Sequence, residues 1–423
     1  MADDVKVAEE RHASWLELFF DLTVVAAAAQ ISHRLHGAET VGQVAICAAM
    51  FYAIWSVWTT TSIYANIAGE RTRQRSVLLT MLGVGVMSAS VPGVWPGLLP
   101  EGSHHPGGRT VAFTVAFLLC RLIAARSAGS DGQVVAFWPA TQGLMAAPWV
   151  VALVVPDETA YWLWAGGVVA DLVSSMMGAR DQKAMDRTTQ AMQKRQEHLD
   201  RQAYRRFLRL LTKDRVSTAD APQPTLLSVA KVERGHLDER LGLFVIIVLG
   251  EAVAQVVAAN ADLEWTAPVV IASLMGFVLL VELWRLTTLY GFSTAPRTTA
   301  PLEPAKALPA HLGVTAAMIA IAAGLGALIL QAGHELETKE RWYLFGGLTL
   351  YFVVSVLTGI AGRAPLKWFL GWSLPSLLAS VAVGVLAGPL PAWSLAVLAG
   401  VILFWFSGYN WLMDRREPGA DAA

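Results

Sequence analysis

Long apolar runs recur along this chain at the length that a lipid bilayer demands. A helix needs about 20 apolar residues to cross a hydrocarbon core about 30 Å thick. Only 15% of the residues are charged, against about 25% in soluble proteins. The sequence therefore predicts an all-α polytopic membrane protein, and not a row of soluble domains. We expect about twelve transmembrane helices, at 14–34, 41–67, 77–99, 110–128, 133–155, 159–178, 241–259, 267–290, 310–331, 342–360, 366–387 and 392–412.

The distribution of Lys and Arg predicts how these spans are oriented. Cytoplasmic loops of membrane proteins carry an excess of basic residues. If the N-terminus is inside, 28 basic residues fall on the inner side and 4 on the outer side. The first fourteen residues are polar and acidic, without the basic, apolar and cleavage regions of a signal peptide. We expect a multi-pass protein with both termini in the cytoplasm.

Two parts of the chain resemble each other. A shift of 225 residues places Leu18 and Phe19 on Leu243 and Phe244, and a shift of 226 places 58–64 on 284–290. Six spans per copy is an even number, so both copies would face the same way, as in transporters built from parallel repeats. We predict an N-terminal six-helix half, a charged cytoplasmic linker and a parallel C-terminal six-helix half, at 1–178, 179–240 and 241–423.

The linker and two aromatic residues allow more local predictions. The segment 180–215 has the composition of a solvated helix. The stretch 180–240 holds 14 basic and 9 acidic residues, so its basic surface either meets anionic lipid headgroups or is simply hydrated. Trp58 and Trp284 lie well inside predicted spans, and we interpret both as core aromatics.

Seven ionisable residues fall inside predicted spans, all between the midplane and the cytoplasmic face. Each costs about 2.5–3.5 kcal/mol to insert, so each needs a reason. If both bases are paired, three carboxylates remain that must be protonated, hydrated or bound to a cation. This excess favours a proton or cation pathway. The alternative is that the bases close structural triads and that Glu17 reaches the interface. The candidate site residues are Glu17, Asp21, Asp171, Glu251, Glu282, Arg121 and Arg285.

Other classes of site find little support. A formal net charge of -1 gives no overall attraction to nucleic acid. Cys47 and Cys120 lie in apolar runs and are typical of buried thiols. Histidine pairs at 33/36 and 104/105 have a spacing that can hold a metal. Surface histidines that bind no metal are commoner, and we predict no metal site. The chain has no phosphate-binding loop or nucleophile motif, so we expect no cofactor.

Two segments resemble a known family. The stretch 11–22, RHASWLELFFDL, opens the first span, and 236–251, HLDERLGLFVIIVLGE, opens the seventh. Together they resemble the bacterial low temperature requirement A (LtrA) family across most of the chain. The resemblance implies a protein of the bacterial inner membrane and does not imply a reaction. It carries the family's motif positions over to Arg11, Glu17, Asp21, Glu239, Arg240, Gly250 and Glu251, and the two segments, one per half, could meet near the axis between the halves.

These features lead to three hypotheses. The first is a transporter that couples a solute of unknown identity to protons or a small cation. In it Asp21 and Glu251 are the exchangeable carboxylates, and Arg121 or Arg285 tunes their pKa. The second is a membrane-stress or lipid-environment factor that does not transport and acts through its cytoplasmic linker. The third is an intramembrane enzyme acting on lipid, but no nucleophile or cofactor motif accompanies the acids, so we expect no enzyme. The partners that we expect are the lipid bilayer and protons, a small cation or a solute, and we expect no nucleic acid.

Overall fold

The structure is a computed structural model of the whole chain and consists almost entirely of helices. It describes residues 14–69, 72–95, 107–129, 133–134, 146–178, 182–211, 228–229, 232–290, 302 and 304–416. Two parallel two-residue strands pair within this part, β1 (Gln133–Val134) and β2 (Ser228–Val229). The motif residue Arg11, the histidines His104 and His105, and residues 135–145 of the predicted span 133–155 lie outside the described residues.

Helices fill both the N-terminal and the C-terminal part of the chain. The N-terminal helices are α1 (Trp15–His36), α2 (Val41–Ala68), α3 (Gln74–Ser90), α4 (Gly108–Gly129), α5 (Ala147–Val151) and α6 (Asp157–Gly178). Next comes α7 (Gln182–Leu211), which confirms the helix predicted in the linker. The C-terminal helices are α8 (Arg234–Asn260), α9 (Ala267–Tyr290), α10 (Pro304–Leu330), α11 (Thr338–Ala361), α12 (Leu366–Trp368), α13 (Leu374–Leu386) and α14 (Ala392–Arg416).

Within the described residues, nine helices are long and apolar enough to cross a membrane. They are α1, α2, α3, α8, α9, α10, α11, the α12–α13 unit and α14, and they coincide with nine predicted spans. Inside a bilayer a helix is favoured because it satisfies its own backbone hydrogen bonds. The helices α4 and α6, 22 residues each, occupy the predicted spans 110–128 and 159–178 but are not among the nine. In the predicted span 133–155 the described helix is only the short α5.

Two helix beginnings are fixed by reciprocal caps. The Ser14 hydroxyl accepts a hydrogen bond from the Glu17 backbone, and the Glu17 side chain accepts one from the Ser14 backbone. Thr40 and Gln43 make the same capping box at the start of α2. Such a box satisfies two backbone N–H groups that the first turn of a helix would leave unpaired. At α1 it also fixes the rotamer of Glu17, which lies in the candidate site.

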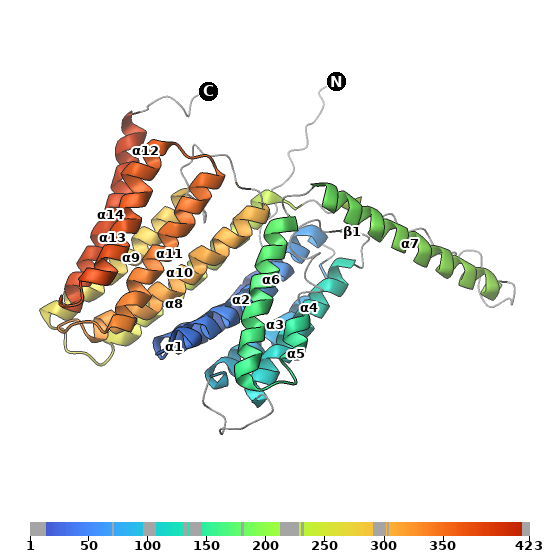
Figure 1. Cartoon of the computed structure of the whole chain (residues 1–423), viewed down its shortest axis with the longest axis horizontal. Coiled ribbons are helices and arrows are strands. Elements are labelled where there is room, and N and C mark those ends of the chain that lie inside the picture. Colours follow the sequence, from blue (N-terminus) through green and yellow to red (C-terminus); the bar gives the residue numbers. More distant parts are fainter. Residues whose placement is uncertain are drawn as a thin grey trace.

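Helix packing follows a similar order in the two parts of the chain. In the N-terminal part α1 packs on α2 and α3, α3 packs on α4, and α6 packs on α2 and α5. In the C-terminal part α8 packs on α9 and α10, α10 packs on α11, and α14 packs on α9 and α13. Figure 1 shows α1 and α2 of the N-terminal part beside α8 and α10 of the C-terminal part.

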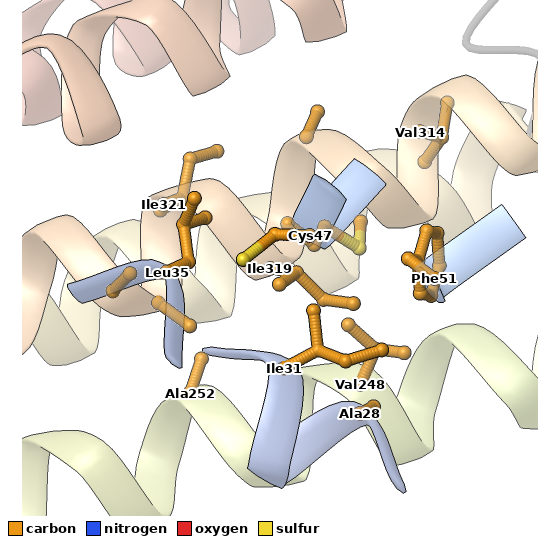
Figure 2. Close-up of a cluster of buried hydrophobic side chains, with 14 of the residues drawn as sticks. Ala28, Ile31, Leu35, Cys47, Phe51, Val248, Ala252, Val314, Ile319 and Ile321 are labelled. Atoms are coloured by element: carbon orange, nitrogen blue, oxygen red, sulfur yellow. The ribbon is translucent and has the colours of Figure 1, made fainter. Parts of the chain in front are cut away.

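The two parts meet along α1 and α2 on one side and α8 and α10 on the other. Buried apolar side chains fill this junction, and Figure 2 shows Ile31 of α1, Phe51 of α2, Val248 of α8 and Ile319 of α10 pointing toward one another. Apolar packing of this kind leaves no place for an unpaired charge. The charged side chains described next lie at one end of the same junction.

Candidate functional site

Asp21 of α1 and Arg240 of α8 form a fully buried ion pair. Arg240 Nη1 donates to Asp21 Oδ2 at 2.9 Å, and Nη2 donates to Oδ1 at 2.8 Å. Both side chains are at most 1% exposed. This two-pronged geometry is the strongest that a guanidinium and a carboxylate can adopt. The contact therefore joins the two motif segments, which the sequence could place near each other only as a hypothesis.

Helix α2 completes the surroundings of this ion pair. The indole Nε1 of Trp58 donates to Asp21 Oδ1 at 2.7 Å, and Arg240 Nη2 also donates to the hydroxyl of Ser62 at 3.3 Å. The Arg240 guanidinium lies 5.9 Å from the centre of the Trp58 ring. Trp58 is fully buried, which confirms it as a core aromatic. Both charged groups thus have buried hydrogen-bond partners, which burial away from water requires.

One turn nearer the helix starts, Glu17 faces His236. Oε1 of Glu17 lies 3.6 Å from Nε2 of His236, and both side chains are at most 5% exposed. Each of these two atoms lacks a hydrogen-bond partner, because 3.6 Å is beyond hydrogen-bond length. The other carboxylate oxygen, Oε2, accepts the capping bond from the Ser14 backbone at 2.7 Å. Glu17 therefore has one anchored oxygen and one that points at an imidazole.

The position of the ring hydrogen of His236 follows from Asn66 on α2. The Asn66 Oδ1 accepts from the backbone N–H of Glu233 at 2.9 Å, and its Nδ2 donates to the Glu233 carbonyl at 2.9 Å. The same Nδ2 lies 3.0 Å from His236 Nδ1. An amide nitrogen can only donate, so Nδ1 of His236 accepts. In the neutral ring the hydrogen then sits on Nε2 and is directed at Glu17.

A second buried histidine lies further along the junction. Trp55 Nε1 of α2 donates to His311 Nδ1 at 2.9 Å, and His311 Nε2 lies 3.1 Å from the Leu241 carbonyl of α8. Because indole is a donor and a carbonyl an acceptor, His311 carries its hydrogen on Nε2 as a neutral ring. Its ring is stacked on Trp58 at 5.6 Å. His311 of α10 thus connects three helices behind the ion pair.

The two contacts between α1 and α8 form a ladder. Glu17 and Asp21 are four residues apart on α1, and His236 and Arg240 are four apart on α8, so each pair occupies one helix face. Glu17 meets His236, and Asp21 meets Arg240. Contacts in the same order mean that the two helices run in the same direction here. With His236 neutral, the four side chains include two carboxylates and one guanidinium, which is a formal net charge of -1 when both acids are ionised.

The remaining predicted site residues lie in other places. Arg121 of α4 binds Asp171 of α6, with Nη1 to Oδ2 at 2.6 Å and Nη2 to Oδ1 at 3.3 Å. Arg285 binds Glu282 on the same helix at 2.9 Å, and Glu282 also accepts from Ser407 at 2.5 Å. The sequence suggested that one of these arginines would tune Asp21. Instead Arg240 binds Asp21. Arg121 binds an acid on another helix, and Arg285 binds an acid one turn away on its own helix.

Glu251 is also separated from Asp21. It follows Arg240 by eleven residues, which is about 16 Å along α8, and it accepts a hydrogen bond from Gln255 at 2.7 Å. Of the other motif positions, Gly250 has open space where a Cβ would point, and Glu239 precedes Arg240 on the partly buried side of α8. The structure therefore brings together Glu17, Asp21 and Arg240 but not Glu251.

Four site residues were absent from the sequence-based set. His236, Asn66, Trp58 and His311 all contact the charged ladder or its supports. His236 could have been found from its four-residue spacing to the motif residue Arg240, which matches the spacing of Glu17 and Asp21. The sequence-based prediction assigns it no place inside the membrane because the predicted span begins at 241, whereas α8 begins at Arg234.

No cluster of three or more metal-ligating side chains of His, Cys, Asp and Glu occurs among the residues that the structure describes. Of the two histidine pairs considered from the sequence, His33 and His36 lie in the last turns of α1. The buried ladder itself offers one carboxylate oxygen facing one imidazole. Such a pair can hold a proton, or a carboxylate can bind a small cation.

Spanning helices around a buried charged junction define a polytopic helical membrane protein with a polar site inside it. Comparison with known families agrees with this class. Residues 12–406 match the family described as bacterial low temperature requirement A protein (LtrA), and the chain belongs to that family. A search of curated proteins and a search of solved structures each found no match.

Proposed function

We propose that the chain is a transporter, not an enzyme, that couples a solute to protons or a small cation through the Glu17, Asp21, His236 and Arg240 ladder. The observation that carries this proposal is the net charge of the buried ladder. Of its two carboxylates, Asp21 binds the guanidinium of Arg240 and Glu17 faces the imidazole of His236, and an uncompensated charge buried in a membrane is costly. A proton or cation that enters the site removes this cost, so its occupancy and the conformation of the protein are linked.

The contacts of His236 indicate what an added proton would change. A proton on Glu17 would neutralise the carboxylate and weaken its attraction to α8. A proton on Nδ1 of His236 would turn that atom into a donor facing Nδ2 of Asn66, which is also a donor. The helix α2 and the start of α8 would then move apart at this contact. Protonation at either group therefore favours movement between α8 and the pair α1–α2, which is the motion that a parallel-repeat transporter needs.

The proposal includes twelve spans in two parallel six-helix halves, with both termini in the cytoplasm of a bacterial inner membrane. Three observations support it. The ladder requires α1 and α8 to run in the same direction, as the odd number of spans between the first and the seventh would produce. The order of helix packing recurs from α1–α6 to α8–α14. Basic residues are concentrated in the segments that this orientation places inside.

Reconstituted protein tests the coupling directly. Liposomes with a trapped pH dye would be exposed to amino acids, sugars, nucleosides and inorganic cations. We expect proton movement that depends on one of these solutes, and we expect its loss in Glu17→Gln and His236→Gln. Glu340→Gln is the matched control, because Glu340 is also a buried acid, hydrogen bonded to Gln331 at a distant position on α11. Equal proton movement in wild type and both ladder variants would contradict the proposal.

A second candidate function is that of a non-transporting membrane factor acting through the linker. The favouring observation is α7, a 30-residue helix with exposed charged side chains. Deleting 185–215 separates the two candidates. If the deletion abolishes growth in the cold while leaving solute-dependent proton movement intact, the linker carries the function. If only the ladder variants fail in both assays, the transporter proposal stands.

A further inference from the structure

Helix α7 has two chemically different faces. Leu199, Ala203 and Phe207 recur every four residues on one face. Arg201, Arg205 and Arg209 recur with the same spacing, two residues later. Two residues correspond to a rotation of about 200° around a helix, so the arginine stripe lies opposite the apolar stripe.

The apolar side of α7 is partly exposed in the structure. Leu199 is 49% exposed and Tyr204 is 48% exposed, whereas Phe207 is buried, with its ring 6.2 Å from that of Tyr204. Arg201, Arg205 and Arg209 are exposed as well. Figure 1 shows α7 leaving the bundle sideways, across the direction of α8 and α10. No other described helix packs extensively along it.

In the proposed topology, α7 begins close to the membrane surface. It begins four residues after the end of α6 at Gly178, and α8 returns to the bundle at Arg234. At about 1.5 Å per residue, a helix of this length extends about 45 Å. A helix that is tethered at such a surface, apolar on one face and basic on the other, has the pattern of an interfacial helix.

We propose that α7 lies in the headgroup layer of the membrane that its own chain spans, where it binds anionic phospholipid. The charge of the helix identifies this occupant. Its 30 residues include eight basic and three acidic side chains, which suits a negatively charged surface and not a zwitterionic one. The stripe of Leu199, Ala203 and Phe207 enters the boundary of the acyl chains. Arg201, Arg205 and Arg209 remain at the level of the phosphates, because long basic side chains reach polar groups from a buried stem.

This inference is independent of transport, and full-length protein in nanodiscs can test it. Both native cysteines are buried, so Cys47→Ala and Cys120→Ala give a background for single labels. A polarity-sensitive fluorophore is placed at Leu199→Cys, and its matched control is placed on the opposite face at Arg201→Cys. The probes are phosphatidylcholine discs with and without phosphatidylglycerol, each containing a quencher attached to the acyl chain.

We expect quenching at position 199, not at 201, and only in discs that contain phosphatidylglycerol. Each arginine near an anionic surface contributes about fivefold to binding. Combining Arg201→Glu, Arg205→Glu and Arg209→Glu should therefore abolish the dependence on phosphatidylglycerol. Arg75→Glu, Lys339→Glu and Lys367→Glu change the net charge equally and should leave it intact.

Three results would overturn the proposal. Water-like fluorescence at both positions in both lipids would mean that α7 is hydrated on all sides. Quenching that is equal with and without phosphatidylglycerol would mean that charge does not select the lipid. Protection at 199 that depends on the number of protein copies per disc, without acyl-chain quenching, would mean that a second copy covers the apolar face.

Discussion

Arg240 combines deep burial with a dependence on one partner. Its guanidinium is 1% exposed and gives two hydrogen bonds to Asp21, while its Nε has no partner. A buried ion pair adds little net stability compared with apolar residues of similar shape, but loss of one member leaves a charge without compensation. The stability of the protein should therefore depend on the match between Asp21 and Arg240 more than on either residue alone.

Replacement of Arg240 by glutamine tests this dependence. Arg240→Gln leaves the Asp21 carboxylate buried without a cation, and we expect a loss of about 3–5 kcal/mol in stability. The double variant Asp21→Asn, Arg240→Gln removes both charges and should recover most of that loss, because neutral amides can still bind Trp58 and Ser62. Thermal unfolding in detergent measures both. A double variant less stable than Arg240→Gln would show that the ion pair is not the source of the effect.

Two tryptophans show what sequence can and cannot tell about single residues. Both Trp58 and Trp284 lie inside apolar spans, and both were predicted to be core aromatics. Trp58 is fully buried, but Trp284 is 48% exposed on α9, so the second prediction is wrong. In a membrane protein the lipid-facing surface is as apolar as the core. Hydropathy therefore cannot separate the two surfaces, whereas buried charges such as Asp21 must face inward and are predictable.

At the scale of helices, α10 and α11 approach each other through glycine. A Cβ on Gly324 of α10 would lie 2.5 Å from the backbone nitrogen of Leu344 on α11. On the α11 side, a Cβ on Gly347 would lie 2.9 Å from the Ala317 carbonyl oxygen of α10. Small residues permit such backbone contact, which is a main source of helix association where both lipid and core are apolar.

A methyl group at position 324 should separate these helices. Gly324→Ala meets backbone, which cannot rotate away, so we expect a loss of about 1–3 kcal/mol. The matched control is Gly326→Ala on the same helix, where the nearest atom is the Gln255 side-chain oxygen at 3.6 Å. Comparing thermal unfolding of the purified variants distinguishes them. If both variants unfold at the wild-type temperature, close backbone packing of α10 on α11 does not limit stability.

The ends of helices were harder to predict than their existence. The apolar runs predicted 41–67 and 267–290, and the helices observed are α2 and α9, Val41–Ala68 and Ala267–Tyr290. In contrast, α8 was predicted from 241 and begins at Arg234. Charged residues end an apolar run in the sequence. In the structure His236 and Arg240 stay helical, because partners on α1 and α2 compensate their burial.

On the scale of the whole molecule, contacts between its two parts occur at three levels. At one end lie the Asp21–Arg240 pair and the hydrogen bonds between Asn66 and Glu233. His311 connects α2, α8 and α10 further along. Near the far end of α1, the Tyr343 hydroxyl donates to the Ala38 carbonyl at 2.6 Å. Movement of one part against the other would therefore change polar contacts at one or more of these levels.

The proposed orientation predicts which loops face the cytoplasm. Figure 1 shows the starts of α1 and α8, the end of α6 and the end of α14 on the same side of the molecule. In the Cys47→Ala, Cys120→Ala background, Lys194→Cys on α7 should react with a membrane-impermeant maleimide only after spheroplasts are lysed. Glu337→Cys, at the opposite end of the bundle beside α11 and 62% exposed, should react in intact spheroplasts.

Because 28 of the 32 basic residues lie on the predicted inner side, the charge distribution opposes inversion. The reverse labelling pattern would contradict the orientation, and labelling of both sites before lysis would contradict their placement on opposite sides of the membrane.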